Sequence, residues 1–407
     1  MVCAYIAFDV VPAPKGAAIH IAAFAQQLLA RFGRLTLVTV APSAAAPTPS
    51  LNWPGLEHVQ LPADGATLVH RVLNFRRHLC AWLTGRHFAA IQFRSIYEGW
   101  PLARQPGRYG DRLIFEVNGL PSIELKYRYP DVADDRELMQ KLWFQEQYCL
   151  AAADAIITPS PVTRDYLQSR HLPADKIHVI PNGVDLDLFR PAPLPKRQPG
   201  EPLRLLYFGI LAAWQGVDLA IRAAALAASE LPVELAVIGR ATRSQQLALA
   251  RLADKLGIGD RVHYHQPLPQ PELVERIHAA DATVVPLALN DRNLVQGCCP
   301  LKLLEGMAAG RPAIASDLPV TRAIGRHEQE LLLTKPGLAP PLADAILRLG
   351  TESALAQQLA TQAQQHIARH YTWAKAGTKL AQVYTALGVP SAEISPNIGS
   401  VIKMVLL

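Results

Sequence analysis

Short apolar runs alternate with helix-like segments along most of this chain. In the first half we predict strands at Tyr5–Val11, Leu35–Val40, His58–Leu61, Ala89–Phe93, Leu113–Val117 and Ala155–Thr158. In the second half we predict strands at Leu203–Gly209, Val233–Gly239, Val262–His265, Ala282–Pro286, Ala313–Ser316 and Glu330–Leu333. We expect helices at Ala18–Arg31, Asp134–Ala151, Ser244–Leu256, Pro271–Ala279, Pro341–Leu349 and Ala354–His370, and one more that begins at Val217. Apolar strands separated by helices are typical of parallel sheets with both faces covered, so the fold class is α/β.

A proline-rich segment divides the chain. Pro191–Pro202, PAPLPKRQPGEP, holds five prolines in twelve residues and is expected to be a semi-rigid linker. Each side of it opens with an apolar strand, a turn and a helix, and 407 residues suit two domains. We therefore expect Rossmann-like domains over residues 1–190 and 203–370, a last helix at 371–388 and a loose tail at 389–407.

The composition limits which classes of binding partner are expected. A net charge of +6 favours an anionic ligand or an anionic membrane surface. No dense basic helix or nucleic-acid module is present, so nucleic acid is not expected as a partner. The start of the chain lacks a secretory pattern, and no apolar run reaches the ~20 residues of a membrane span. The five cysteines form no CxxC pair, which favours a reducing cytoplasm, and peripheral contact with the inner membrane face stays open.

The stretch Gly297–Asp317, GCCPLKLLEGMAAGRPAIASD, has the pattern of a ligand-binding helix. Pro300 and Leu301 open it, since proline fits a first turn, where its missing N–H is not needed. The free N–H groups of that turn, with Lys302 beside them, form an anion site. Glu305 lies one turn further in, within reach of a polyol attached to the anion. A diphosphate followed by a ribose fits this pattern; the alternative is a buried Leu-Ala helix with two solvated charges.

Ligands of open α/β sheets bind beyond the carboxyl ends of the strands, so loops after strands are candidate sites. In the second half, the loop GILAAWQG runs from Gly209 through Gln215 to Gly216. Arg240 follows the next predicted strand and could place a guanidinium near phosphate, although an exposed arginine at a helix start is as good an interpretation. Arg292, before the Gly297 stretch, could face the same site.

Two loops of the first half are weaker candidates. Lys15 and Gly16 follow the first strand and open a helix, where a small residue lets a ligand approach the backbone; a simple tight turn is as good an interpretation. His20, on the first turn, could face the ligand, but a lone histidine is more often structural. Glu116 and Asn118 end another strand and could bind a sugar hydroxyl; the alternative is an Asn-Gly turn.

Taken together, these residues resemble glycosyltransferase family 4, whose members have the two-domain GT-B fold. The likeness covers about residues 3–388. Ile180–Asp185 matches the family's I-P-N-G-V-D segment, and Phe208–Asp218 matches its nucleotide-sugar phosphate loop. Pro300–Ser316 matches P-x-x-x-x-E-A-M-A-x-G-x-P-V-x-A-S, with Gly306 in place of the common alanine. Tyr371–Trp373 resembles the start of the last helix, which in the family crosses back to the first domain.

The resemblance implies transfer of a sugar from a UDP- or GDP-sugar to an acceptor hydroxyl, with retention of configuration and without a metal or other cofactor. The two domains would face each other across a cleft. Glu305 would bind the ribose hydroxyls, Lys302 the diphosphate, and Gly16 would lie under the phosphates or the acceptor. The expected donor-binding residues are Gly209, Gln215, Gly216, Arg240, Gly297, Pro300, Leu301, Lys302 and Glu305. The acceptor or phosphate loop would hold Lys15, Gly16, His20 and Glu116.

The chain departs from the family pattern at three points. Ile210 and Gln215 stand where the family often has Arg and Lys in the phosphate loop. Gly297 stands eight positions before Glu305, where the family has the first of two paired glutamates. Asn118 stands in place of a first-domain histidine. The expected catalytic residues are Lys302, Glu305 and Asn118.

The acceptor would be a glycan or a lipid-linked molecule, as in surface polysaccharide assembly, which is an expectation from the family. Two other functions stay open from the sequence. One is a non-catalytic nucleotide-sugar-binding protein, which the lost Arg, Lys and Glu positions favour. The other is a sugar-nucleotide epimerase on the same fold, for which more acid and base residues would be expected.

Overall fold

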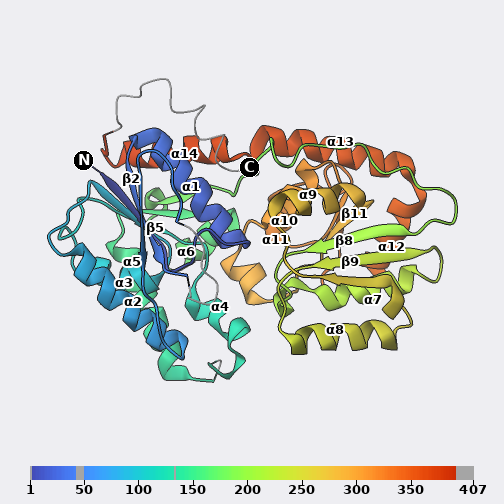
Figure 1. The fold of residues 1–407 in the computed structure, drawn as a ribbon, viewed down its shortest axis with the longest axis horizontal. Helices are drawn as coiled ribbons and strands as arrows, with labels where there is room; N and C mark the ends of the chain where they lie inside the picture. The colour runs from blue at the N-terminus through green and yellow to red at the C-terminus, as the bar shows by residue number, and fades with distance from the viewer. Residues whose placement is uncertain (1, 43–49, 133, 391–407) are drawn as a thin grey trace. The chain divides into compact units, whose positions relative to one another are not determined.

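The computed structural model describes residues 2–42, 50–132 and 134–390, and the chain divides into two compact units (Figure 1). Unit 1 comprises Met1–Pro181 and Trp373–Leu407, and unit 2 comprises Asn182–Thr372. Both are α/β units with parallel sheets, as the alternation of strands and helices predicts. The expected tail, from residue 391 onward, lies outside the described residues.

Unit 1 is built on a seven-stranded parallel sheet in the order β3-β2-β1-β4-β5-β6-β7. Its strands are β1 Cys3–Ile6, β2 Leu35–Val40, β3 Leu56–Leu61, β4 Ala90–Phe93, β5 Leu113–Glu116, β6 Ala155–Thr158 and β7 Ile177–Val179. Its helices are α1 Gly16–Phe32, α2 Leu68–Leu83, α3 Ile96–Ala103, α4 Pro121–Arg128, α5 Arg136–Ala152, α6 Pro161–Ser169 and α14 Trp373–Ala386.

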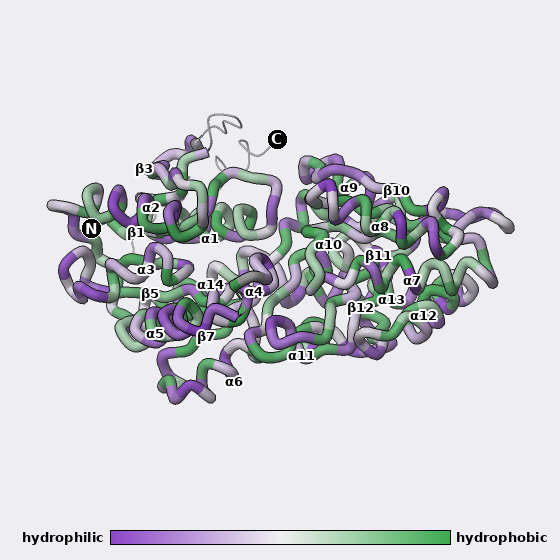
Figure 2. The backbone as a smooth tube through the Cα atoms, turned by 90° about the horizontal axis from the view of Figure 1, so that it is seen from below, coloured by the Kyte–Doolittle hydropathy of each residue, from purple (hydrophilic) through white to green (hydrophobic). Residues whose placement is uncertain are grey.

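Each face of this sheet has its own apolar core. Successive strand residues point to opposite faces, so Ala4 and Ile6 of β1 pack with α2, α3 and α5, while Cys3 and Tyr5 pack with α1 and α14. The helices are amphipathic, and the hydropathy colour alternates along them (Figure 2). This double cover explains why the strands read as continuous apolar runs.

Unit 2 has a six-stranded parallel sheet in the order β10-β9-β8-β11-β12-β13. Its strands are β8 Leu203–Phe208, β9 Val233–Ile238, β10 Val262–His265, β11 Ala282–Val285, β12 Ala313–Ser316 and β13 Leu332–Thr334. Its helices are α7 Val217–Ala227, α8 Arg243–Lys255, α9 Gln270–Ala279, α10 Leu301–Ala308, α11 Pro319–Arg322, α12 Ala339–Thr351 and α13 Ser353–His370. A π-helical turn at Arg292–Gln296 precedes α10.

Several elements differ from the prediction. The first strand ends at Ile6 instead of Val11, because the chain bends at Phe8 and Asp9, although Asp9 O still accepts from Val40 N–H of β2 at 2.8 Å. The short strand β7 and the helices α2, α3 and α4 were not predicted. In α2 the buried residues have helical spacing, so a signal was present among its arginines and histidines; they are Val72, Phe75, Leu79 and Leu83.

The sequence predicts that the proline-rich segment joins the two domains. In the structure it lies within unit 2 instead. The buried guanidinium of Arg311 explains this, because its Nη2 donates to the carbonyls of Ala192 at 2.5 Å and Pro193 at 2.9 Å. Ala192 N–H in turn bonds Ala309 O at 3.3 Å. An extended proline-rich chain keeps its carbonyls open as acceptors, and here a buried cation uses them.

The first boundary also lies earlier than expected, because residues 182–190 belong to unit 2. Asn182 Nδ2 donates to Cys299 O at 2.6 Å, and Val184 N–H bonds Tyr371 O at 2.8 Å. The I-P-N-G-V-D segment, whose structural interpretation the sequence favoured, therefore holds the loop that leads into α10.

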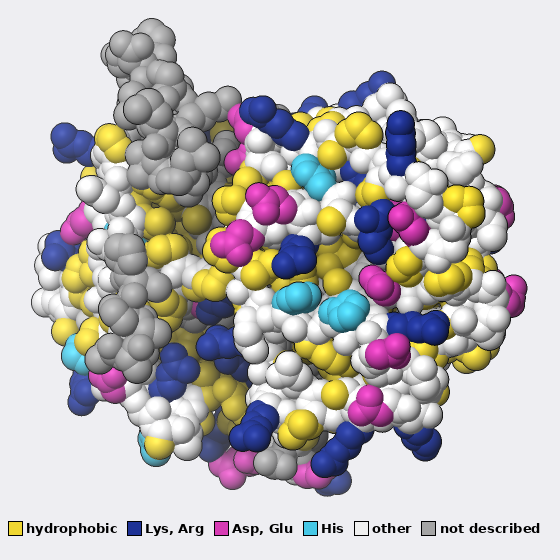
Figure 3. Space-filling model, turned by 45° about the vertical axis from the view of Figure 1, so that its right-hand side comes forward, with side chains coloured by type: hydrophobic (Ala, Val, Ile, Leu, Met, Phe, Trp, Pro, Cys, Tyr) yellow, Lys and Arg dark blue, Asp and Glu magenta, His cyan; other side chains and the backbone are white. Residues whose placement is uncertain are grey.

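One face of the surface carries mixed charge. On the face that Figure 3 displays, Lys and Arg side chains are interspersed with Asp and Glu side chains. Within the described part of the chain, no helix combines the length and apolar character needed to cross a membrane. The five cysteines are free thiols.

Candidate active site

Lys302 and the loop after β8 lie together at the carboxyl edge of the unit 2 sheet. Lys302 is in the first turn of α10, and its Nζ donates to the Tyr207 hydroxyl at 2.9 Å and to Gln215 Oε1 at 2.7 Å. Nζ also lies 4.0 Å from the centre of the Tyr207 ring. A Cβ at Gly209 would lie 3.0 Å from Lys302 Cε and Nζ, so a side chain there would crowd the ammonium. The structure thus brings together Lys302, Gln215 and Gly209, which the sequence placed in two separate motifs.

The hydrogen bonds of Lys302 account for two of its N–H donors. The Tyr207 hydroxyl donates its own proton to Ile210 O at 2.6 Å, so towards Lys302 it acts as an acceptor. A charged lysine has three N–H donors, and the Tyr207 and Gln215 oxygens take two of them. Among the described residues, no further acceptor takes the third donor.

Gly216 fixes the turn that places Gln215 next to Lys302. Its φ is +69°, and a Cβ there would lie 1.8 Å from Pro286 O in the loop after β11. Both the left-handed backbone and the contact with a main-chain carbonyl require glycine.

Gly216→Ala is therefore expected to lower the melting temperature clearly more than Gly257→Ala does. Gly257 also has a positive φ, +73°, but no atom lies within 4 Å of a Cβ built on it. Both substitutions carry the left-handed strain of about 1–2 kcal/mol, and the Gly216 variant adds the carbonyl overlap. Thermal unfolding of the two variants measures the difference, and equal shifts would contradict this account of the turn.

The entry to α10 is shaped by the residues before it. Pro300 is the N-cap of the helix and not part of its first turn, which begins at Leu301. Gly297 has φ +80° and ends the π-helical turn by donating its N–H to Arg292 O at 3.0 Å. The N–H of Gly297 is thus used within the protein, although its position still lacks the carboxylate of the family.

Two of the basic side chains expected near phosphate differ in their surroundings. Arg292 stacks on Trp214, with its guanidinium carbon 5.3 Å from the ring centre. Arg240 has an exposed side chain, and its carbonyl accepts from Leu211 N–H at 3.2 Å. Asn293, beside Arg292, is fully buried and donates to Ala288 O at 2.8 Å, so it is a structural residue.

Burial moves the pKa values of Lys302 and Glu305 toward neutrality. Desolvation lowers the pKa of Lys302 to about 7, and Arg292 adds to this effect while Cys298 and Glu305 oppose it. Desolvation raises the pKa of Glu305 to about 7, opposed by the charge of Lys302. Glu305 is 6% exposed. An anion bound at Lys302 would favour its charged form and raise its pKa again.

In unit 1, Glu116 is the centre of a buried network and does not face a ligand. Its carboxylate is 1% exposed and accepts from the Tyr5 hydroxyl at 2.7 Å, Gln92 Nε2 at 2.6 Å and Arg94 Nε at 2.8 Å. His20 Nε2 lies 2.7 Å from it. The prediction that Glu116 binds a sugar hydroxyl is therefore wrong, because its oxygens are already occupied by the protein's own donors.

The charge of Glu116 is fixed by these partners. Burial by itself raises the pKa of Glu116, but the charges of His20 and Arg94 and the hydrogen bonds from His20 and Tyr5 outweigh it and hold the pKa at about 2. Asn118 Nδ2 also donates to Glu116. Glu116 thus positions neighbouring side chains at the carboxyl edge of the sheet.

The other predicted residues of unit 1 lie around this network. Lys15 is the N-cap of α1 and pairs with Asp9, and Gly16 is the exposed first residue of the helix. His20 is 4% exposed, and its ring lies 5.7 Å from that of Trp373. His20 is therefore held inside the protein beside Glu116.

Two residues of these clusters were missed in the sequence, Tyr207 in unit 2 and Arg94 in unit 1. Arg94 directly follows β4, so the rule that singled out Glu116 at the end of β5 could also have found it. Tyr207 lies inside an apolar strand, where nothing in the sequence distinguishes it from a core aromatic residue.

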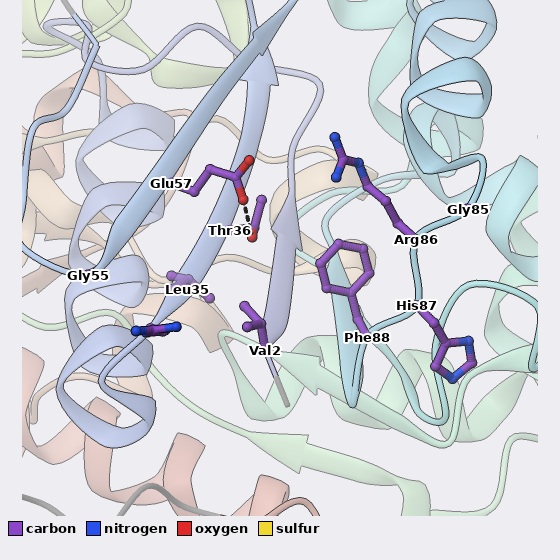
Figure 4. Close-up of a pocket in the computed structure, with 10 residues that line it drawn as sticks. Val2, Leu35, Thr36, Gly55, Glu57, Gly85, Arg86, His87 and Phe88 are labelled. Atoms are coloured by element: carbon purple, nitrogen blue, oxygen red, sulfur yellow. Dashed lines mark hydrogen bonds between the residues drawn. The ribbon is translucent and has the colours of Figure 1, made fainter.

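A large hollow lies at the opposite edge of the unit 1 sheet (Figure 4). It measures about 490 Å³ and is lined by residues before or at the amino ends of the strands, among them Val2, Thr36 and Phe88. Glu57 accepts there from the Thr36 hydroxyl at 2.9 Å. Because ligands of parallel α/β sheets bind at the carboxyl edge, we do not assign the substrate site to this hollow.

In the described ranges, His, Cys, Asp and Glu side chains form no group of three or more that could hold a metal ion.

Comparison with known proteins identifies the family of the chain. A family model described as Glycosyltransferase Family 4 matches residues 14–188, and one described as Glycosyl transferases group 1 matches residues 202–352. The D-inositol 3-phosphate glycosyltransferase of Thermobispora bispora is 30% identical over 337 residues, which cover 75% of each chain. The chain therefore belongs to glycosyltransferase family 4, and it is a glycosyltransferase.

Solved structures show the same GT-B fold. Sucrose-phosphate synthase from Thermosynechococcus elongatus superposes with a TM-score of 0.79 at 22% identity, covering 95% of this chain and 99% of that one. Anabaena HepE, solved with UDP and glucose, has a TM-score of 0.71 at 16% identity, covering 95% of this chain and 100% of that one.

Proposed function

We propose that the protein is a retaining, metal-independent glycosyltransferase that uses a UDP- or GDP-sugar. The observation that carries this proposal is the position of Lys302, held by Tyr207 and Gln215 at the start of α10 with Glu305 one turn further in. A diphosphate on Lys302 and the first N–H groups of α10 would place a ribose beside Glu305. The complex of HepE with UDP-glucose supports a uridine nucleotide among the candidates.

The chemistry would be mainly electrostatic. As the bond from the sugar to the diphosphate breaks, negative charge grows on the leaving phosphate. Lys302 and the N–H groups of α10 are already oriented to stabilise this charge, so little reorganisation is needed during the reaction. The leaving phosphate would take the proton of the acceptor hydroxyl on the same face of the sugar, which gives retention of configuration.

The acceptor would bind to unit 1, near Asn118 and the start of α1. The carbonyl oxygen of Asn118 would meet a substrate hydroxyl while its amide nitrogen is held by Glu116. The names of D-inositol 3-phosphate glycosyltransferase and sucrose-phosphate synthase favour a small polyol or sugar as one class of acceptor beside a lipid-linked one.

A screen of donors with the purified protein tests this proposal. Melting temperatures are measured with UDP- and GDP-sugars, and nucleotide release is measured for each donor that binds, with and without EDTA. We expect one nucleotide to bind and to be released in both conditions, and NMR of the product to show the anomer of the donor. Loss of activity in EDTA, or an inverted anomer, would refute metal independence or retention.

We further propose peripheral contact with the cytoplasmic membrane face through the outer side of α5. Its Trp143, Phe144 and Tyr148 are 49%, 57% and 40% exposed, and Arg104 stacks on the neighbouring Trp100. Exposed aromatic and basic side chains together favour an anionic lipid surface. Co-sedimentation with anionic vesicles but not neutral ones is expected, and Phe144→Ser should weaken it.

Binding of the nucleotide is expected to take up protons at pH 8. Free Lys302, with its pKa lowered to about 7, is mostly neutral at that pH, and the bound diphosphate raises its pKa and draws in a proton. Affinity should therefore fall as pH rises above about 7. Calorimetry in buffers of different ionisation enthalpy measures close to one proton per nucleotide. Lys302→Met should abolish the uptake, and buffer-independent enthalpies for the unmodified protein would contradict it.

A further inference from the structure

The guanidinium of Arg94 is only partly used by the protein. Arg94 follows β4, and its Nε donates to Glu116 Oε1 at 2.8 Å. Its two Nη groups have no hydrogen-bond acceptor among the described residues. The side chain is 12% exposed, so the guanidinium retains some access from outside.

The position of the Arg94 guanidinium is fixed by the buried Glu116 network. Glu116 is held by Tyr5, Gln92 and His20, so Arg94 cannot turn away from it without leaving a buried carboxylate short of a partner. β4 lies between β1 and β5, with Phe93 beside Ile6 and Phe115. Arg94 therefore emerges at the centre of the carboxyl edge of the unit 1 sheet.

Other charged groups lie at this edge, and the carboxylate of Asp9 acts electrostatically on Arg94. The ammonium of Lys15 is paired with Asp9 after β1. Arg71 donates to Ala63 O beyond the end of β3 at 3.2 Å. Lys15 also caps α1, a 17-residue helix whose first N–H groups favour negative charge. The negative charge of Glu116 is offset by its pairs with Arg94 and His20.

We propose that Arg94 binds an oxyanion, a phosphate or a carboxylate, carried by the acceptor. Two Nη donors on a rigid plane match two oxygens of such a group, a geometry that a neutral hydroxyl uses only in part. Arg94 is thus an acceptor-binding residue and Glu116 its positioning residue. This inference rests on the proposed transferase function, because it names the chemical class of the acceptor.

The test has a binding arm and a turnover arm. With UDP present at saturation to occupy the donor site, inorganic phosphate at constant ionic strength is expected to raise the melting temperature of the full chain. Nucleotide release from the donor is then compared for neutral hexoses and polyols, their monophosphates and the corresponding uronic acids. We expect release at least tenfold faster with one of the two anionic sets, and the better set tells phosphate from carboxylate.

Variants test whether Arg94 causes the preference for anionic acceptors. Arg94→Lys keeps the charge beside Glu116 but loses the planar pair of donors, so it should raise KM for the anionic acceptor about tenfold or more. The donor KM and the slow donor hydrolysis without acceptor should not change. Arg77→Lys, at an exposed position of α2, is the matched control. A single variant that removes one charge leaves the other buried and unpaired, which destabilises the fold. The double variant Arg94→Gln with Glu116→Gln removes both charges and avoids this.

Two results would overturn the inference: an equal response of the unmodified protein and Arg94→Lys to phosphate, or neutral acceptors that work as well as anionic ones. Failure of the transferase proposal itself would give a different result, because UDP would then not bind and no donor would be hydrolysed.

Discussion

Lys302→Met is expected to lower turnover about 10²–10³-fold, with a smaller effect on folding than on rate. This is the typical cost of removing one preorganised donor from a developing oxyanion. Methionine keeps most of the apolar stem of the side chain but removes Nζ, and with it the charge and the contact of Nζ with the Tyr207 ring. Initial rates of nucleotide release at saturating donor and acceptor measure the change.

A second substitution and a control sharpen this result. Lys302→Arg keeps the charge but brings a larger head group to a place where Gly209 leaves about the width of an ammonium, so it should not restore the rate. Lys335→Met, at an exposed position of unit 2, should behave like the unmodified protein. A fully active Lys302→Met variant would remove the proposed donor site from α10.

Glu116→Ala is expected to destabilise unit 1 by about 3–5 kcal/mol, the usual cost of deleting one member of a buried ion pair. The substitution leaves Arg94 without its buried counter-charge and takes an acceptor from Tyr5 and Gln92. Denaturant unfolding monitored by circular dichroism measures the loss. Glu137→Ala removes an exposed carboxylate paired with Lys141 and should change nothing measurable.

The same carboxylate gives stability a defined pH dependence. Its pKa is held at about 2 in the folded protein, against an ordinary value of 4.5. Because the folded value is the lower one, its contribution is present above about pH 4.5 and is lost as the pH falls toward 2. Melting temperatures between pH 3 and 7 should fall less steeply in Glu116→Gln than in the unmodified protein. Parallel curves for the two proteins would show that the network does not hold the charge.

The strands could be predicted because they are buried on both faces, and uniform burial leaves an apolar run in the sequence. The edge strand β7 is shorter and half-exposed at His178, so it leaves no such run. In the proposed donor site, the motifs singled out Lys302 and Gly209. Their meeting with Tyr207 depends on how β8 and α10 pack, which residue spacing does not encode.

The roles in unit 1 were harder to predict for a similar reason. Glu116 and Asn118 have the residue types of a sugar site, and the pattern favoured that interpretation. Whether Glu116 faces a ligand depends on Gln92 and Arg94 of β4, which come beside it only through the strand register. Long-range pairing of this kind decides between a binding residue and a positioning residue.

The helix α14 has a consequence for how the protein is made. Ala376, Leu380, Val383 and Tyr384 complete one core of unit 1, and the Tyr384 hydroxyl donates to Gln92 Oε1 at 2.9 Å. All of unit 2 is encoded before this helix. During synthesis on the ribosome, one apolar face of unit 1 therefore stays uncovered until unit 2 has been synthesised. A stop codon before Trp373 would leave the second unit intact and the first one permanently unfinished.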